Sequence, residues 1–142
     1  MDKNILIRDY IPGDYKKLSK LWFITGLSTP QRGDDDEVIK KTLAQGGKLL
    51  VMEIKETLDL IGSSWITNDG RRLYLHHFAI HPAHQGKKYA IPLVDLSLQY
   101  AKSLNMQIKL EVHKDNVPAI NLYTKNGFSY LGDYLVFIIR SF

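Results

Sequence analysis

The chain has 142 residues, of which 44% are hydrophobic and 24% charged, with a formal net charge of +4 and no cysteine. This length suits a single domain over residues 1–142 that buries about two-thirds of its unfolded surface. The lack of cysteine excludes disulfides, thiolate metal sites and a cysteine nucleophile. No apolar run approaches the roughly 20 residues of a membrane helix and the N-terminus lacks a secretory pattern, so we expect a cytoplasmic protein without a membrane partner.

The positive charge is distributed over separate pairs rather than one long basic block. These pairs are Lys16-Lys17, Lys40-Lys41, Arg71-Arg72 and Lys87-Lys88. A nucleic-acid surface requires clustered basic residues, so nucleic acid is not the expected partner. A small ligand that carries phosphate requires only one such pair.

The first third of the chain predicts a strand and two helices. Ile5 to Ile7 is typical of a short strand. Apolar positions then recur at helical spacing from Tyr15 to Thr25, and Gly26 ends that helix. The acidic run at residues 34–37 favours the start of a second helix, because carboxylates stabilise the positive end of the helix dipole. Gly46-Gly47 stops it.

Three strand-like runs follow, at residues 48–54, 59–67 and 73–80. Asn68-Asp69-Gly70 is a strong hairpin signal between the second and the third. The runs therefore predict an antiparallel meander. Within the third run we expect the side chains of His76 and His77 to point to opposite faces, because side chains alternate along a strand.

The pattern changes after His81-Pro82. Residues 89–104 predict a helix, in which Pro92 is expected to cost one hydrogen bond. Residues 108–112 alternate as a strand, and residues 116–126 predict a helix with proline in its first turn and glycine just past its end. Residues 130–142 predict two final short strands around Gly132-Asp133.

These elements predict an α/β fold of the α+β type, with a mixed, mostly antiparallel central sheet. The strand–helix–strand unit in its centre should form one right-handed parallel βαβ crossover. Ligands of such units lie beyond the carboxyl ends of the parallel strands. This places a site at residues 78–90 and 111–116.

Two segments carry a resemblance to a known family. Residues 73–90 read LYLHHFAIHPAHQGKKYA, and residues 116–128 read NVPAINLYTKNGF. The first is similar to the acetyl-CoA signature of the GNAT N-acetyltransferase superfamily, and the second to the family's Asn…Ala…Tyr…Gly-Phe helix. The resemblance implies a GNAT-like fold with helices on both faces of the sheet. It also implies transfer of an acetyl group from acetyl-CoA to an amine. The family pattern has glycine where this chain has Lys88.

The loop at residues 85–88 is also a phosphate site on physical grounds, since it opens a helix whose first N–H groups lack internal partners. The resemblance implies that Asn116 contacts the pantetheine arm and that the Phe78 amide polarises the acetyl carbonyl. The resemblance implies cofactor binding by the residues that follow, of which only the loop at 85–88 and the helix start after it are also supported by the physical argument: Phe78, Ala79, Ile80, Gln85, Gly86, Lys87, Lys88, Tyr89, Ala90, Asn116 and Tyr123.

Two catalytic residues are expected. The resemblance implies that the Tyr123 hydroxyl protonates the leaving thiolate of CoA. Glu111 is a hypothesis for the general base, with His76, His77 or water as the alternatives, since histidine titrates near neutrality. We expect no metal site, because His77, His81 and His84 share no helical face and have no carboxylate at ligand spacing.

The acceptor is expected to be a small-molecule or peptide amine. The acidic residues Asp34 to Glu37 are interpreted as a helix start, with attraction of cationic amines as the alternative. A non-catalytic CoA-binding sensor or interaction domain is the alternative function. The sequence leaves monomer and homodimer both open.

Overall fold

The computed structural model describes residues 2–29 and 31–142. The described chain divides into two compact units, the first ending at Glu111 and the second beginning at Val112. None of the helices in the described residues is long and apolar enough to cross a membrane.

The first unit is built on a five-stranded sheet in the order β1-β2-β3-β4-β5. β1 (Ile5–Asp9), β2 (Lys48–Ile54), β3 (Leu60–Asn68) and β4 (Leu73–Ile80) pair antiparallel in sequence. β5 (Ile108–Leu110) pairs parallel to β4, from Leu73 opposite Ile108 to Leu75 opposite Leu110. The predicted meander and the parallel crossover are therefore confirmed.

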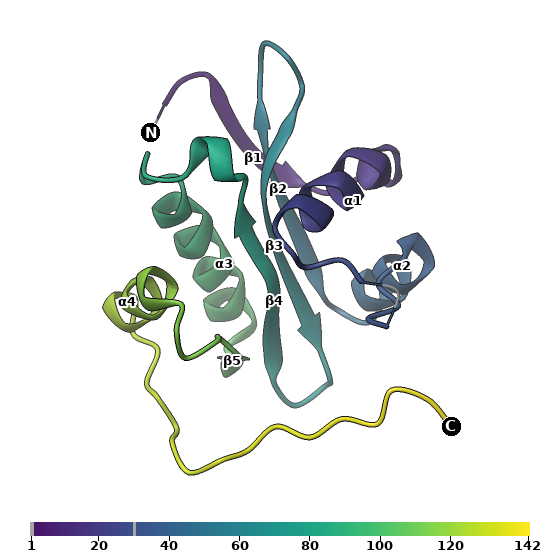
Figure 1. Ribbon diagram of the computed structural model, residues 1–142, viewed down its shortest axis with the longest axis vertical. Coiled ribbons are helices and arrows are strands. Elements are labelled where there is room, and N and C mark those ends of the chain that lie inside the picture. The colour runs from purple at the N-terminus through teal and green to yellow at the C-terminus, as the bar shows by residue number, and fades with distance from the viewer. Residues whose placement is uncertain (1, 30) are drawn as a thin grey trace. The chain divides into compact units, whose positions relative to one another are not determined.

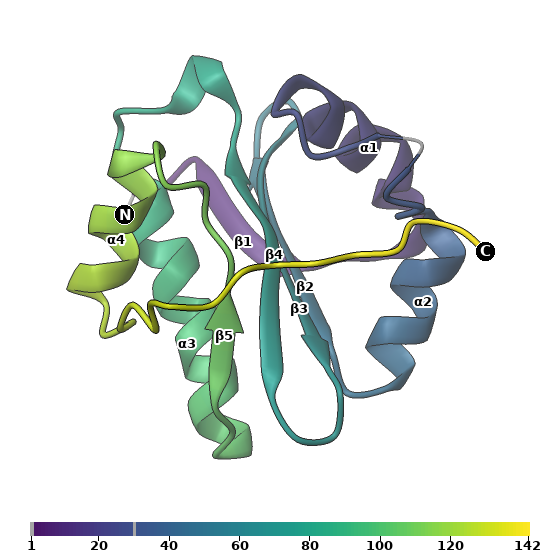
Figure 2. The ribbon, with the colours of Figure 1, turned by 60° about the horizontal axis from the view of Figure 1, so that its bottom comes forward.

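Helices cover both faces of this sheet (Figures 1 and 2). α1 (Tyr15–Ile24) and α2 (Asp36–Ala44) lie on one face, and α3 (Ala90–Leu104) lies on the other. A short 3-10 turn, η1 (Pro12–Asp14), leads into α1, and a second, η2 (Pro82–His84), follows β4. The two faces of the sheet carry different side chains, because successive residues of a strand point to opposite faces.

Two clusters of buried side chains make up the core. On the face of α1 and α2, Trp22 and Trp65 stack with ring centroids 5.5 Å apart, surrounded by Leu18, Ile39 and Val51. On the face of α3 the cluster contains Ile5, Leu50, Met52, Ile61, Ile80 and Leu93. Ser64 and Ser97 add a buried hydroxyl pair at 2.7 Å between β3 and α3.

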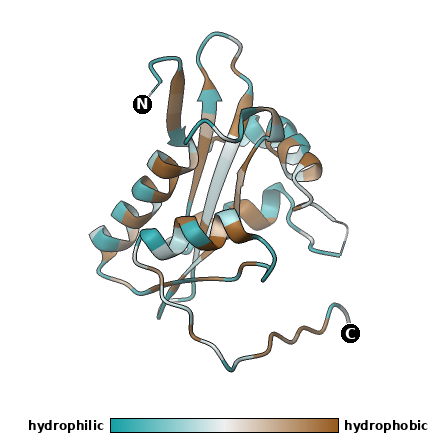
Figure 3. Cartoon of the chain, turned by 60° about the vertical axis from the view of Figure 1, so that its left-hand side comes forward, coloured by the Kyte–Doolittle hydropathy of each residue, from teal (hydrophilic) through white to brown (hydrophobic). Residues whose placement is uncertain are grey.

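The second unit contains α4 (Val117–Lys125), which matches the predicted helix. The two predicted final strands are wrong: residues 129–142 form no regular element, although hydrophobic residues fill the end of this segment (Figure 3). Local composition favoured strands there, but a strand also requires a neighbour for its N–H and C=O groups. Phe137 is 86% exposed and Leu135 82%.

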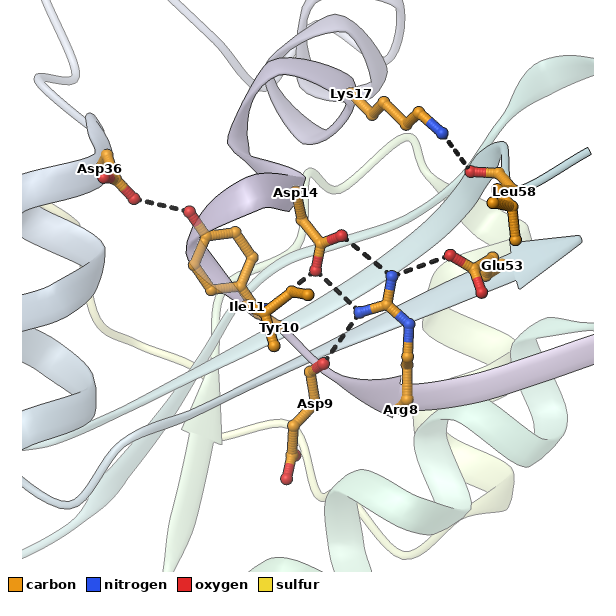
Figure 4. A network of polar contacts seen from close by, with 9 residues as sticks. All are labelled: Arg8, Asp9, Tyr10, Ile11, Asp14, Lys17, Asp36, Glu53 and Leu58. Carbon is orange, nitrogen blue, oxygen red and sulfur yellow. Dashed lines mark hydrogen bonds and ion pairs between the residues drawn. The ribbon is translucent and has the colours of Figure 1, made fainter. Parts of the chain in front are cut away.

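A network around Arg8 connects β1, η1 and β2 (Figure 4). The Arg8 guanidinium donates to both carboxylate oxygens of Asp14, at 2.8 and 2.9 Å, and to Glu53 at 2.8 Å. The Ile11 N–H also donates to Asp14, which is buried. Burial alone would raise the pKa of Asp14, but the bonds from Arg8 and Ile11 hold it below its ordinary value. The network therefore stabilises the charged carboxylate.

This network predicts that Asp14→Asn lowers the free energy of unfolding by about 2 kcal/mol at pH 7, because Arg8 loses one of its two charged partners and the site of Asp14 is buried. The folded-state pKa of Asp14 is depressed. The stabilisation is therefore complete above the unfolded pKa of about 4 and is lost as the pH falls through the folded pKa. Urea unfolding of both proteins at pH 7, 5 and 3 measures the difference, which should be constant at the first two values and shrink at the third.

Glu37→Gln is the matched control, since Glu37 forms an exposed pair with Lys40 at 3.4 Å. Its effect should stay within about 0.5 kcal/mol. A difference between Asp14→Asn and the native chain that is as large at pH 3 as at pH 7 would show that the charge of Asp14 is not what stabilises the fold.

Candidate functional site

A β-bulge in β4 sets the geometry of the candidate site. Ser63 pairs with Ala79 and Trp65 pairs with His76, so His77 and Phe78 together lie opposite the single residue Ser64. The backbone of His77 has a φ of 45°, in the left-handed region that residues other than glycine seldom occupy. A bulge of this kind bends its strand and re-aims the side chains around it.

The bulge places both histidines on the face of α1 and α2. The His77 ring packs edge-on against Trp22, with centroids 4.5 Å apart, and against Trp65 at 5.2 Å. The His76 ring lies 6.3 Å from Trp65. The expectation that the two histidines point to opposite faces is therefore wrong, because the extra residue interrupts the alternation on which it depended.

His77 is held from three sides. The Ser63 hydroxyl donates to the His77 carbonyl oxygen at 2.6 Å and accepts from the Trp22 indole N–H at 3.0 Å. His77 Nε2 lies 2.9 Å from Asp34 Oδ2 without the geometry of a hydrogen bond. Its side chain is only 7% exposed. These contacts offset the cost of the left-handed backbone, which is about 1–2 kcal/mol.

His76 is a neutral imidazole at physiological pH. Burial lowers its pKa to about 4, with a smaller contribution from the nearby His77. Its Nε2 lies 2.9 Å from the hydroxyl of Thr67, and its ring stacks on Tyr74 with centroids 4.5 Å apart. A group with so low a pKa is a weak base near neutral pH.

Glu111 lies on the same face, one residue beyond the end of β5. The last parallel pair is Leu75 with Leu110, and the ladder between β4 and β5 ends there. The Tyr74 hydroxyl donates a short hydrogen bond to Glu111 Oε1. Burial, and then this bond to Glu111, raise the pKa of Tyr74, so the tyrosine keeps its proton and the carboxylate keeps a donor. Glu111 itself is exposed.

The acidic run divides between two roles. Asp35 caps α2, accepting from the Val38 N–H at 2.9 Å, and Asp36 accepts from the Tyr10 hydroxyl at 2.6 Å. Asp36 and Glu37 both lie in the first turn of α2, where their charges complement the dipole. Asp34 precedes the helix and faces His77 instead. The helix-start interpretation thus accounts for three residues of the run, and only Asp34 reaches the sheet.

The loop between β4 and α3 is shaped by side chains at its start. Gln85 Nε2 donates to the Ile80 carbonyl at 2.9 Å, and His81 Nδ1 accepts from the Ala83 N–H at 3.0 Å. Within the described residues no acceptor faces the backbone N–H of Gly86, Lys87 or Lys88. Those three residues are exposed. The loop therefore fits an anionic group such as a pyrophosphate.

Lys88 adopts the backbone conformation of a glycine. Its φ is 64°, and the φ of Gly86 is 80°. The lysine thus follows the path expected for the glycine of the family pattern, at a cost of about 1 kcal/mol. No heavy atom lies within 4 Å of a Cβ built on Gly86, so the loop is open above that residue.

Pro92 does not remove a helix hydrogen bond, contrary to the sequence expectation. α3 begins at Ala90, which makes Pro92 its third residue. The first N–H groups of a helix have no internal acceptor, so the missing N–H of proline leaves no carbonyl unpaired. Near the start of this helix the Tyr89 hydroxyl donates to Asp2 at 3.0 Å, while its ring packs on the cluster under α3.

Asn116 and Tyr123 belong to α4 in the second unit. Asn116 is the N-cap, and its side-chain oxygen accepts from the Ala119 N–H at 3.3 Å. Tyr123 is buried and packs edge-on against Phe128, with centroids 5.6 Å apart. Burial raises the pKa of Tyr123 to about 12. Gly127, with a φ of 97°, ends the helix as predicted.

The structure brings together a group of residues that the sequence analysis treated separately. His76, His77 and Glu111 all lie on the face of α1 and α2. The sequence alone did not indicate Tyr74, or that Asp34 lies beside His77 while the other three acidic residues belong to the start of α2. Tyr74 could have been found from its alternation with His76 along β4. Side chains of Phe78 and Ile80 instead pack under α3, as expected for core residues.

Comparisons with known proteins identify the family and the fold of the chain. Residues 15–128 match the acetyltransferase (GNAT) family. Streptothricin acetyltransferase of Escherichia coli is 37% identical over 59 residues, which are 41% of this chain and only 34% of that protein. The chain is also similar to the crystal structure of an acetyltransferase from Streptococcus agalactiae, with a TM-score of 0.78 and 16% identity over 97% of this chain and 92% of the other.

A third likeness is to a predicted acetyltransferase from Clostridium acetobutylicum, crystallised with acetyl-CoA. The TM-score is 0.72 with 18% identity, over 94% of this chain and 96% of that one. At these identities the two solved structures establish the fold, while the family match covers most of the chain. The protein therefore belongs to the GNAT family of acetyltransferases, enzymes that use acetyl-CoA.

Proposed function

We propose that this protein transfers the acetyl group of acetyl-CoA to a primary amine by direct attack of the amine, with both substrates bound together. The observation that carries the proposal is the Glu111 carboxylate, exposed and held by the Tyr74 hydroxyl beside the point where the pairing of β4 with β5 ends. Bound acetyl-CoA supplies an acetyl group activated as a thioester. The chain has no cysteine to carry that group, in keeping with direct transfer.

Glu111 is the proposed general base. A primary amine with a pKa near 10 is almost fully protonated at pH 7 and must lose a proton before it attacks. The His76 ring is shielded from water and engaged by the Thr67 hydroxyl, and the Nε2 of His77 is enclosed beside Asp34, whereas the Glu111 carboxylate is exposed. Glu111 accepts the proton through a water molecule, while the Tyr74 hydroxyl keeps the carboxylate in place.

The loop from Gln85 to Ala90 is the proposed cofactor site. The open N–H groups at residues 86–88 and the ammonium groups of Lys87 and Lys88 bind the pyrophosphate. Phe78, Ala79 and Ile80 at the end of β4 flank the pantetheine arm, as the family resemblance implies. Asn116 is assigned to the same arm in addition to capping α4.

Tyr123 is the proposed general acid. A pKa of about 12 keeps its hydroxyl protonated throughout the physiological range, so it is always a donor. The leaving sulfur belongs to a thiol with a pKa of about 8.5. Tyr123 donates a hydrogen bond to that sulfur and supplies its proton as the carbon–sulfur bond breaks.

The function and the role of Glu111 are tested together with a panel of primary amines. The native protein should release free CoA thiol and give acetylated amines by mass spectrometry. Glu111→Gln should lower kcat by roughly 10²-fold at pH 7. The loss should shrink as the pH approaches the amine pKa, because more of the amine is then already neutral. Glu56→Gln is the control, since Glu56 is exposed in the turn after β2. A Glu111→Gln protein with native kcat at pH 7 would refute the assignment.

The role of Tyr123 predicts a different kinetic pattern. Tyr123→Phe keeps the ring beside Phe128 but removes the hydroxyl, so the fold and the affinity for acetyl-CoA should barely change. We expect kcat to fall by roughly 10²–10⁴-fold with little change in KM, because the proton is required only as the thiolate leaves. Tyr130→Phe is the matched control, since Tyr130 is 96% exposed. A thioester with a more acidic leaving thiol should be less sensitive to Tyr123→Phe, and equal sensitivity would count against proton donation.

Two substitutions of Lys88 separate the effect of its charge on CoA binding from the effect of its backbone strain. Lys88→Ala removes the ammonium and keeps the strain of a positive φ, whereas Lys88→Gly also removes the ammonium but relieves that strain. Calorimetric titration with CoA should therefore give the weakest binding for Lys88→Ala, with Lys88→Gly between it and the native chain. The loss of one phosphate contact should be about threefold to tenfold in Kd. Lys102→Ala, exposed on α3, serves as the control, and equal affinity of all three loop proteins would show that Lys88 has no part in binding.

A further inference from the structure

A hollow of about 190 Å³ lies on the face of α1 and α2, beside the hairpin that joins β3 to β4. Its lining shares two residues, Tyr74 and His76, with the surroundings of Glu111. The complete lining is Thr67, Asp69, Arg71, Arg72, Tyr74, His76 and Lys109. The proposed function assigns no task to the charged residues of this set.

Positive charge exceeds negative charge around this hollow. Arg71, Arg72 and Lys109 carry three positive charges, and Asp69 is the single carboxylate of the lining. Asp69 Oδ1 is occupied by the hairpin backbone, accepting from the N–H groups of Arg71 at 2.8 Å and Arg72 at 2.7 Å. Those two bonds hold the pKa of Asp69 below its ordinary value, so it stays ionised.

The three cationic side chains have no ion-pair partner among the described residues. Lys109 Nζ lies over the ring of Tyr74, 5.8 Å from its centroid. Guanidinium groups without partners beside a hollow are suited to an anion, because their planar N–H pattern matches carboxylate and phosphate oxygens. The hollow therefore attracts anions, whereas the Glu111 carboxylate attracts cations.

The positive charge of Lys109 and the negative charge of Glu111 lie two residues apart along the chain. Lys109 pairs with Tyr74, and Glu111 follows two residues later on the same side of β5. Two residues of a strand span about 7 Å. Arg72 lies in the hairpin just before β4, two residues before Tyr74, and so is farther from the level of Glu111 than Lys109 is. An acceptor that reaches both groups needs its amine and its anion separated by several bonds.

We infer that the acceptor is an amine that also carries a carboxylate or a phosphate, which Arg71, Arg72 and Lys109 bind while the amine lies at Glu111. This inference rests on the proposed function, because it takes Glu111 as the group that receives the amine proton. It names a zwitterionic acceptor with separated charges. Polycationic amines are disfavoured, since the hollow repels a second positive charge.

The test compares acceptors of matched length that differ only in the distal group. Acetylation of 5-aminopentanoate, 5-aminopentanamide and 1,5-diaminopentane is followed by thiol release, and phosphoethanolamine is compared with ethanolamine. We expect kcat/KM for the anionic member of each set to exceed that of the uncharged member by about tenfold or more. The two sets together distinguish a carboxylate acceptor from a phosphate acceptor.

Arg72→Gln and Lys109→Gln should each reduce this preference about tenfold, through a higher KM for the anionic acceptor, and should leave KM for acetyl-CoA unaltered. Arg72→Lys should restore part of the preference, since it returns the charge without the planar fork. Lys102→Gln, a change of the same kind on α3, should have no effect on it. Raising the salt concentration should weaken the preference in the native protein.

The outcomes separate this inference from the proposed function. Equal or better acetylation of the uncharged amine or the diamine would overturn the anion site and leave the acetyltransferase intact. If no amine is acetylated, the proposed function fails, and calorimetric titration with 5-aminopentanoate and phosphoethanolamine decides the anion site. Binding that is lost in Arg72→Gln would support the site, and the absence of binding to the native protein would overturn it.

Discussion

One extra residue in β4 determines how the first unit presents its polar groups. The bulge at His77 and Phe78 sets two residues against Ser64, and its strained backbone is held by Trp22, Trp65 and the Ser63 hydroxyl. Because the alternation is interrupted there, both histidines lie on the face of α1 and α2, while Phe78 packs under α3. The tryptophan pair is thus both the core of that face and the support for its polar residues. In a perfectly regular strand one imidazole would instead lie on the face of α3, which is packed largely with apolar side chains.

Burial determines which of the titratable side chains on this face are charged. His76 is neutral because it is shielded from water, and Tyr74 keeps its proton because it is partly buried and bound to Glu111. The exposed carboxylate of Glu111 thus lies beside the neutral donor Tyr74, whose ring stacks on His76. Of these groups Glu111 is the one that is both charged and exposed, whereas His76 is neutral and shielded. Arg71 and Arg72 in the nearby hairpin and Lys109 on β5 add positive charge beside this carboxylate.

The loop after β4 shows how a departure from a family pattern can be accommodated by the backbone. Lys88 takes a positive φ in place of glycine, while Gln85 ties the loop to the end of β4. The cost is about 1 kcal/mol, which is small beside the free energy that a cofactor contributes on binding. In return the loop gains an ammonium group next to open backbone N–H groups. The chain keeps the shape expected of a phosphate loop and changes its charge.

Much of the fold was readable from local patterns. The meander, the parallel crossover and α1 to α4 follow from periodicity, caps and turn residues such as Asn68 to Gly70 and Asn116, because these signals act within a few residues. The short motif at 85–88 predicted a loop that opens a helix, and the structure has that loop between β4 and α3. Local patterns could not predict features that depend on residues distant in sequence. The side of the sheet taken by His77 depended on a bulge against β3, and the pKa of His76 on its burial. The bond between Tyr74 and Glu111, 37 residues apart in sequence, depended on the register of β4 with β5. Residues 130–142 had the composition of strands but pair with no strand among the described residues, and a strand requires a neighbour that completes its hydrogen bonds.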